Sequence, residues 1–310
     1  MAEGNRIMTI VTEKIVDVGG VATRLLDTDP QAAKGACSLL LHGGAPGVTP
    51  YCGGAHLWGG LIDTLARTER VVAPDLLASG GTGAGEGPLT VDRMVAHVTD
   101  LIDWIGQDSI HLVGHDLGGM VALLTAIKAP ERVASLTIVA SQAASPTGDG
   151  VENFTFLAPP LPLWSRESQS WAYDRLCYSQ HSIDEPLLEA SVSAALKPGH
   201  SAVAGPRLAL DGDLATSILR AKSRFFRVAR EEGVKVPVQI IWGKNDPLVS
   251  LDHGVWLFRI IAARQPSAQF HVINRSGSFP WRDQAQEFNR VLAAFHGGLR
   301  EQALRSSAVG

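Results

Sequence analysis

The chain has 310 residues, of which 45% are apolar and 19% are charged, and its formal net charge is −4. This composition is typical of a globular protein with a sizeable core, and the lack of a basic stripe argues against nucleic acid and anionic membranes as partners. The N-terminal segment lacks the apolar core of a signal peptide, and no stretch of 18 apolar residues occurs, so we expect no membrane span. Three scattered cysteines fit a reducing, cytoplasmic location.

Short apolar runs alternate with longer amphipathic patterns in the first half of the chain. An opening hairpin turns at Gly19-Gly20, and the runs at 38–44, 71–75, 109–116 and 133–141 predict buried strands. The segments between these runs carry apolar residues at helical spacing. This alternation predicts an α/β fold with a mostly parallel, doubly wound sheet.

The alternation stops after the fourth of these strands. Residues 142–160 are rich in Ser, Pro, Gly and Thr, and residues 145–230 have helical patterns only. Strands are predicted again at 238–243 and 269–274, followed by a closing helix. We therefore expect a core made of 1–145 and 231–310, and an inserted helical cap over 146–230.

The segment IHLVGHDLGGMVALL carries the clearest chemical signal. A predicted strand ends in Gly114-His115-Asp116-Leu117-Gly118, and a predicted helix begins at once. This is the G-x-nucleophile-x-G elbow, with aspartate at the position of the nucleophile. The turn presents the central side chain to substrate, and the helix directs its N–H groups toward the same place. The alternative is a turn aspartate that caps the helix.

Here the chain resembles the α/β-hydrolase superfamily, over roughly residues 15–298. LLHGGAPG (40–47) resembles the oxyanion-hole loop of the meta-cleavage product (carbon–carbon bond) hydrolases, which implies a hole formed by Gly43, Gly44 and Leu117. VQIIWGKNDPLVSLDHG (238–254) resembles the segment of the triad acid, which falls on Asp246. HVINRSGSFPW (271–281) resembles the segment of the triad base. The order nucleophile, acid, base is that of the superfamily.

The chain departs from this pattern at two positions. Asp116 replaces serine, and this resembles the aspartate-nucleophile branch, the epoxide hydrolases and dehalogenases. Ser278 stands where both branches are expected to carry histidine. In such an enzyme Asp116 would form an ester with the substrate, and a base would then activate water. Serine cannot act as that base near neutral pH, so we expect the cycle to stall or slow at the ester.

The sequence leaves open what replaces the histidine. His115 adjoins the nucleophile but is expected to face the scaffold, and His181 could reach down from the cap. Asp246 could act through a water held in the space that an imidazole would fill. Ser278 could also be a natural residue or an engineered one that traps an intermediate.

The cap is expected to select the substrate. Epoxide hydrolases use cap tyrosines to hold the epoxide oxygen, and Tyr173 and Tyr178 lie in the inserted segment, although packing is the alternative role for each. Aromatic side chains and Leu117 suggest a medium-sized apolar or aromatic substrate. The residues expected to line the substrate site are Tyr173, Tyr178, Trp164, Trp171, His181 and Trp281, and Phe154 and Phe156 add to the aromatic character of the cap.

Three functions remain in competition. The leading one is a hydrolase with Asp116 as nucleophile and an epoxide as substrate. The second is a lyase, isomerase or cyclase that uses Asp116 as an acid and base on a natural-product intermediate. The third is an inactive or trapped ester or carbon–carbon bond hydrolase that serves as a binding protein. No metal cluster or dinucleotide fingerprint occurs, so we expect a small organic molecule as partner and no cofactor; a homo-oligomer remains one alternative.

Overall fold

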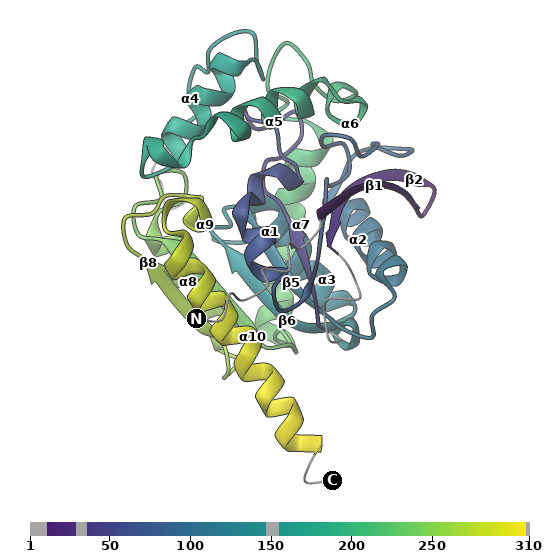
Figure 1. Ribbon diagram of the computed structural model, residues 1–310, viewed down its shortest axis with the longest axis vertical. Helices are drawn as coiled ribbons and strands as arrows, with labels where there is room; N and C mark the ends of the chain where they lie inside the picture. The colour runs from purple at the N-terminus through teal and green to yellow at the C-terminus, as the bar shows by residue number, and fades with distance from the viewer. Residues whose placement is uncertain (1–10, 29–35, 147–154, 308–310) are drawn as a thin grey trace, which may run out of the picture.

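The computed structural model describes residues 11–28, 36–146 and 155–307, and its framework is an eight-stranded sheet of order β1-β2-β4-β3-β5-β6-β7-β8 (Figure 1). β2 pairs antiparallel with β1 and β4, and the other neighbouring pairs are parallel. The predicted α/β class with a mostly parallel sheet is therefore confirmed. The strands are β1 (Val11–Val18), β2 (Val21–Thr28), β3 (Cys37–Leu41), β4 (Arg70–Pro74), β5 (Ile110–His115), β6 (Val133–Val139), β7 (Val238–Gly243) and β8 (Gln269–Ile273).

The inner strands are buried on both faces, which explains why they are continuous apolar runs in the sequence. All residues of β3, β4, β5 and β7 are buried. Successive side chains alternate between two cores: Leu39 and Leu41 join one, and Leu40 joins the other. β8 forms one edge of the sheet, and Val272 in it remains 41% exposed.

Helices cover the two faces. Residues of α2 (Val91–Ile105), α3 (Asp116–Lys128), α7 (Asp213–Glu231) and α8 (Leu251–Ala262) belong to one core, and residues of α1 (Gly60–Leu65) and α10 (Ala285–Ser307) to the other. The limits of α2 follow from its sequence: the Thr90 hydroxyl accepts a hydrogen bond from Arg93 N–H, and Gly106 ends the helix at φ 72°. The short helices are α9 (Pro280–Asp283), η1 (Ala55–Trp58), η2 (Pro130–Arg132) and η3 (Gln180–Ser182).

The segment between β6 and β7 contributes to two places. α4 (Arg166–Leu176), α5 (Glu185–Leu196) and α6 (Pro198–Ser201) lie together at the top of the molecule, whereas α7 contacts α2 and α8 beside the sheet (Figure 1). Residues 147–154, including Phe154, lie outside the described residues. The division into a core and a cap over 146–230 stays a prediction.

Among the residues that the structure describes, no helix combines the length and apolar character needed to cross a membrane.

Candidate active site

Asp116 occupies the sharp turn between β5 and α3. Its backbone has φ 45°, in the left-handed region, and its side chain retains only 8% exposure. Glycine is required on both sides of the turn. A Cβ on Gly114 would lie 2.3 Å from the Gly118 carbonyl oxygen, and a Cβ on Gly118 would lie 2.1 Å from that of Leu41. The turn therefore holds Asp116 in a strained conformation, as the sequence predicts for an elbow.

Backbone N–H groups act on the Asp116 carboxylate. Ala143 N–H donates to Oδ1 over 3.4 Å. Burial raises the pKa of Asp116, and the N–H groups of Ala143, Leu117 and Gly44 and the charge of Lys222 oppose the shift. The N–H groups of Gly44 and Leu117, both expected in the oxyanion hole, therefore favour the ionised form of this carboxylate. Gly43 lies beside them, where a Cβ would come within 3.0 Å of Asp116 Cβ.

Asp246 and Ser278 are brought together on neighbouring loops. The Ser278 hydroxyl donates to Asp246 Oδ1 over 2.6 Å, and the N–H groups of Leu248 and Val249 donate to the same oxygen over 2.9 and 3.1 Å. Asp246 Oδ2 is buried and has no hydrogen-bond partner among the residues described. Burial raises the pKa of Asp246 to about 7, and the negative charge of Asp116 adds to the shift.

Ser278 also joins the loop after β8 to the end of α4. Its N–H donates to the Leu176 carbonyl at the end of α4 over 2.8 Å. A Cβ on the preceding Gly277 would lie 2.1 Å from that same oxygen, so only glycine permits this close approach. The position expected to carry a histidine is therefore fixed tightly against α4, with its side chain 2% exposed.

Neither candidate histidine lies in the position of a base. His115 is 2% exposed, and its ring packs against Phe279 and Trp281 with centroids 5.0 and 4.9 Å away. Burial lowers the pKa of His115 to about 3, so the ring is neutral and part of the scaffold, as expected from its place beside the elbow. His181 is exposed on η3 and is not brought to Asp116.

The two cap tyrosines have different surroundings. The Tyr173 hydroxyl lies 2.7 Å from Ser191 Oγ, and its ring centroid lies 5.5 Å from that of Tyr51. Tyr178 is 51% exposed. The Tyr173 ring therefore packs among the aromatic rings of Tyr51 and Phe279, and its hydroxyl is directed to Ser191. Tyr178 lies at the surface instead.

The tryptophans expected to line the site make structural contacts. Trp164 Nε1–H donates to the Thr49 carbonyl, and Trp281 Nε1–H donates to the Leu57 carbonyl. Trp171 is half-buried, lies 6.3 Å from Phe156 between ring centroids, and carries the Arg175 guanidinium 3.9 Å over its ring. Of the three, Trp281 comes nearest to the elbow, through its contact with His115.

Tyr51 and Lys222, which the sequence did not single out, both interact electrostatically with Asp116. Tyr51 is buried, its ring contacts Tyr173, and the charges of Asp116 and Asp246 add to the effect of burial in raising its pKa. Lys222 of α7 donates from Nζ to the Gln142 carbonyl over 3.0 Å. Burial lowers the pKa of Lys222 to about 8, and Asp116 opposes the shift. Tyr51 follows the oxyanion loop closely and could have been found there; Lys222 belongs to no motif.

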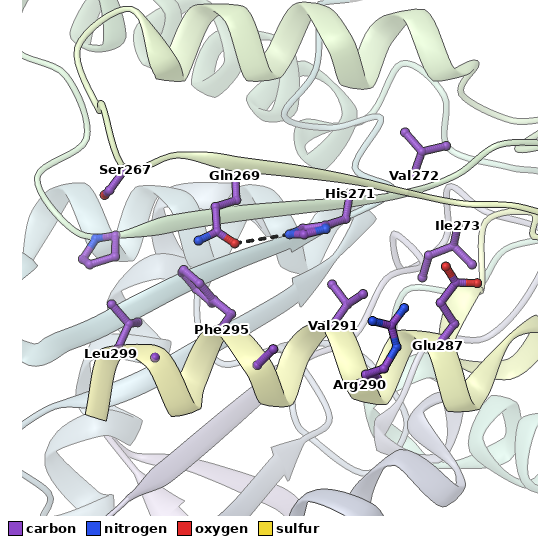
Figure 2. Close-up of a pocket in the computed structure, with 13 residues that line it drawn as sticks. Ser267, Gln269, His271, Val272, Ile273, Glu287, Arg290, Val291, Phe295 and Leu299 are labelled. Atoms are coloured by element: carbon purple, nitrogen blue, oxygen red, sulfur yellow. Dashed lines mark hydrogen bonds between the residues drawn. The ribbon is translucent and has the colours of Figure 1, made fainter. Parts of the chain in front are cut away.

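A groove of about 620 Å³ lies elsewhere, between the edge strand β8 and α10. Figure 2 shows His271 and Gln269 projecting from β8 toward Val291 and Phe295 of α10. β8 is separated from β5, the strand that ends at Asp116, by β6 and β7. This groove is therefore distinct from the site around Asp116.

A family model described as alpha/beta hydrolase fold matches residues 38–280. The chain belongs to this family. A 2-hydroxy-6-oxo-2,4-heptadienoate hydrolase from Pseudomonas putida is 28% identical over 284 residues, which cover 91% of this chain and 95% of the relative. A 2-hydroxy-6-oxo-6-phenylhexa-2,4-dienoate hydrolase from Comamonas testosteroni is 28% identical over 279 residues, covering 86% and 89%. The expected resemblance of this α/β-hydrolase to meta-cleavage product hydrolases is confirmed.

Solved structures support the same fold. A meta-cleavage product hydrolase from Pseudomonas fluorescens superposes with a TM-score of 0.69 at 23% identity, covering 92% of this chain and 97% of that one. A putative lipase from Acinetobacter baumannii gives a TM-score of 0.75 at 19% identity, covering 94% and 93%. These likenesses extend over nearly the whole chain and concern the α/β-hydrolase fold.

Proposed function

We propose that this α/β-hydrolase cleaves an organic substrate by attack of Asp116 on an electrophilic carbon, with a medium-sized apolar or aromatic epoxide as the leading substrate class. The observation that carries the proposal is the buried carboxylate of Asp116 on the strained turn, the place from which an elbow presents its nucleophile to substrate. The backbone N–H groups around it favour its ionised, nucleophilic form. Attack at a saturated carbon leaves the N–H groups of Gly44 and Leu117 to stabilise the carbonyl oxygen of the enzyme ester when that ester is hydrolysed.

The first half of the reaction joins substrate and enzyme. A carboxylate oxygen of Asp116 attacks an epoxide carbon, the ring C–O bond breaks, and the ring oxygen leaves as an alkoxide that takes a proton. Lys222 is the proposed donor, since a buried ammonium with a pKa near 8 is acidic enough to protonate an alkoxide. Tyr51 is the second candidate, because its ring lies beside Tyr173 and is affected by both carboxylates.

The second half releases the product. Asp246 takes a proton from water on its free Oδ2, and the resulting hydroxide attacks the carbonyl carbon of the ester. The charge that develops on the carbonyl oxygen lies at the N–H groups of Gly44 and Leu117. Collapse breaks the ester C–O bond. The leaving alkoxide takes the proton of the newly added hydroxyl, which frees a diol and restores the Asp116 carboxylate, and the proton on Asp246 returns to Lys222. A carboxyl with a pKa near 7 is suited to this role in the place of histidine.

A second candidate function is acid–base catalysis without water, as in a lyase, isomerase or cyclase. The raised pKa values of Asp116 and Asp246 favour it, because two buried carboxyls that share one proton supply an acid and a base together. The curated relatives named for 2-hydroxy-6-oxo-dienoates add a third substrate type for testing. An inactive binding protein would bind a ligand without consuming it.

Intact-protein mass spectrometry with a panel of aromatic epoxides and one 2-hydroxy-6-oxo-dienoate separates these functions. The proposal predicts a covalent adduct with an epoxide, absent in Asp116→Asn and in Asp116→Ala. Consumption of the dienoate without an adduct would overturn it in favour of carbonyl chemistry. Isomerised or eliminated products that contain no oxygen from water would support the acid–base function instead.

A further inference from the structure

A second polar cluster lies at the opposite end of the central strands. His111 of β5 belongs to this cluster. It lies five residues before Asp116, and an extended strand places the two residues roughly 16 Å apart. Ser38 of β3 and Ser135 of β6 are in register with His111 on either side. Three polar residues in a row are unusual in a buried parallel sheet, whose strands are normally apolar.

Glu69 and His296 complete the cluster. Glu69 precedes β4, His296 lies on α10, and the two side chains are 2% and 1% exposed. The His296 ring stacks on that of His111 with centroids 4.0 Å apart. His296 Nδ1 lies 3.2 Å from Glu69 Oε1, which also accepts from the Ser38 hydroxyl over 2.9 Å. The cluster thus joins the starts of two strands to the last helix.

Two buried atoms in this cluster have no hydrogen-bond partner in the part of the chain that the structure describes. They are Glu69 Oε2 and His296 Nε2. Glu69 Oε1 accepts from His296 Nδ1–H, which leaves Nε2 as the ring nitrogen without a partner. His111 Nδ1 lies 2.8 Å from Ser135 Oγ, which leaves Nε2 of that ring for another contact. Buried polar atoms without partners are costly in a dry interior, so a ligand shared by these side chains would be favourable.

We propose that Glu69, His111 and His296 bind a divalent first-row transition metal ion, best matched by Zn²⁺. One ligand atom from each of these residues lies within 4.8 Å of the others. Tetrahedral Zn²⁺ with bonds of about 2.0–2.1 Å holds its ligands roughly 3.4 Å apart. The His111 and His296 rings must therefore turn out of their stack, and the ligand atoms must approach one another by as much as about 1.4 Å.

The site would be structural. Arg300 approaches Glu69 Oε2 to 3.7 Å and is 39% exposed, so it can move to solvent when an ion takes that oxygen. A bound ion would fasten α10 to the starts of β4 and β5, at the end of the sheet away from Asp116. Its effect is therefore on the stability of the native fold and not on the reaction.

Equilibrium dialysis of the EDTA-stripped full chain against ZnCl₂, followed by metal analysis, tests the site. We expect one retained equivalent of zinc, an upward shift of the melting temperature that EDTA reverses, and the visible bands of tetrahedral coordination with Co²⁺. His111→Gln and His296→Gln should each lose the ion and the shift. His97→Gln is the matched control, because His97 is also buried but bonds Thr23 on the other side of the sheet.

Adventitious binding of zinc at the surface would not depend on His111 or His296. Zinc retained equally by the wild type, His111→Gln and His296→Gln would overturn the proposal, as would the absence of any retained equivalent in the wild type. Should either variant fail to fold, the wild-type Co²⁺ spectrum decides alone. Octahedral bands or no bands would contradict the tetrahedral site proposed for Glu69, His111 and His296.

Discussion

The Ser278 hydroxyl donates to Oδ1 of Asp246 over 2.6 Å, and it leaves Oδ2 of that carboxyl buried without a partner among the described residues. An imidazolium at this position would lower the pKa of Asp246, but a neutral hydroxyl leaves it at about 7. With serine at position 278, the proposed function therefore assigns Asp246 the role of a base whose pKa lies near 7.

Replacing Asp246 by Asn should separate the two halves of the reaction. Asn cannot take a proton from water, so the ester should accumulate and steady-state turnover should fall ~10²–10⁴-fold, the usual value of a general base. Rapid-quench mass spectrometry would measure both rates. Unchanged turnover in Asp246→Asn would show that another group activates water.

Ser278→His should speed ester hydrolysis in the same assay. The imidazole would act as the base with Asp246 as its partner, provided that it fits between Asp246 and α4. Ser278→Ala is the control, because it removes the hydrogen bond to Asp246 without supplying a base. Equal rates in Ser278→His and Ser278→Ala would contradict the role given to this position.

The contribution of Asp246 to stability should fall as pH rises from about 4 to about 7. The pKa of Asp246 is raised from 3.8 to about 7 in the folded state, so this group binds more protons in the folded protein than in the unfolded chain in this range. Ionisation of the buried carboxyl should cost a few kcal/mol, roughly 1.4 per pKa unit. Buried histidines such as His111 and His115, whose pKa values burial lowers to about 3, act in the opposite direction in the wild type and in the variant alike. Urea denaturation of the wild type and Asp246→Asn at pH 5 and pH 8 therefore measures the loss as the difference between the two pH profiles, and parallel profiles would contradict the assignment.

Lys222→Gln should slow the formation of the ester. Without the ammonium, the alkoxide has lost its proposed proton donor and Asp116 has lost a cation that favours its ionised form. We expect an adduct rate ~10²-fold lower, with hydrolysis of the ester less affected. Lys128→Gln, on the exposed end of α3, is the control. An unaffected adduct rate in Lys222→Gln would shift the role to Tyr51, which Tyr51→Phe then tests.

The sequence was sufficient for the features that depend on local pattern. The buried strands and the elbow at Asp116 follow from apolar runs and glycines, and the pairing of Asp246 with residue 278 follows from the resemblance to α/β-hydrolases. The surroundings of Asp116 depend on packing between distant segments and were not predicted. The amphipathic face of α7 did not reveal that α7 lies against α2 and α8, where Lys222 reaches the turn after β6. In the same way, Tyr178 and His181 were expected near the site, but the path of the chain after α4 leaves both at the surface.

A single turnover in H₂¹⁸O, with enzyme in excess over an epoxide that the panel identifies, tests the role of Asp116 most directly. Water should attack the carbonyl carbon of the ester, so the first diol should carry an oxygen from Asp116 and the label should appear in the peptide that contains Asp116. Label found only in the diol, with none in that peptide, would mean that water attacks the substrate itself. Asp116 would then not be the nucleophile.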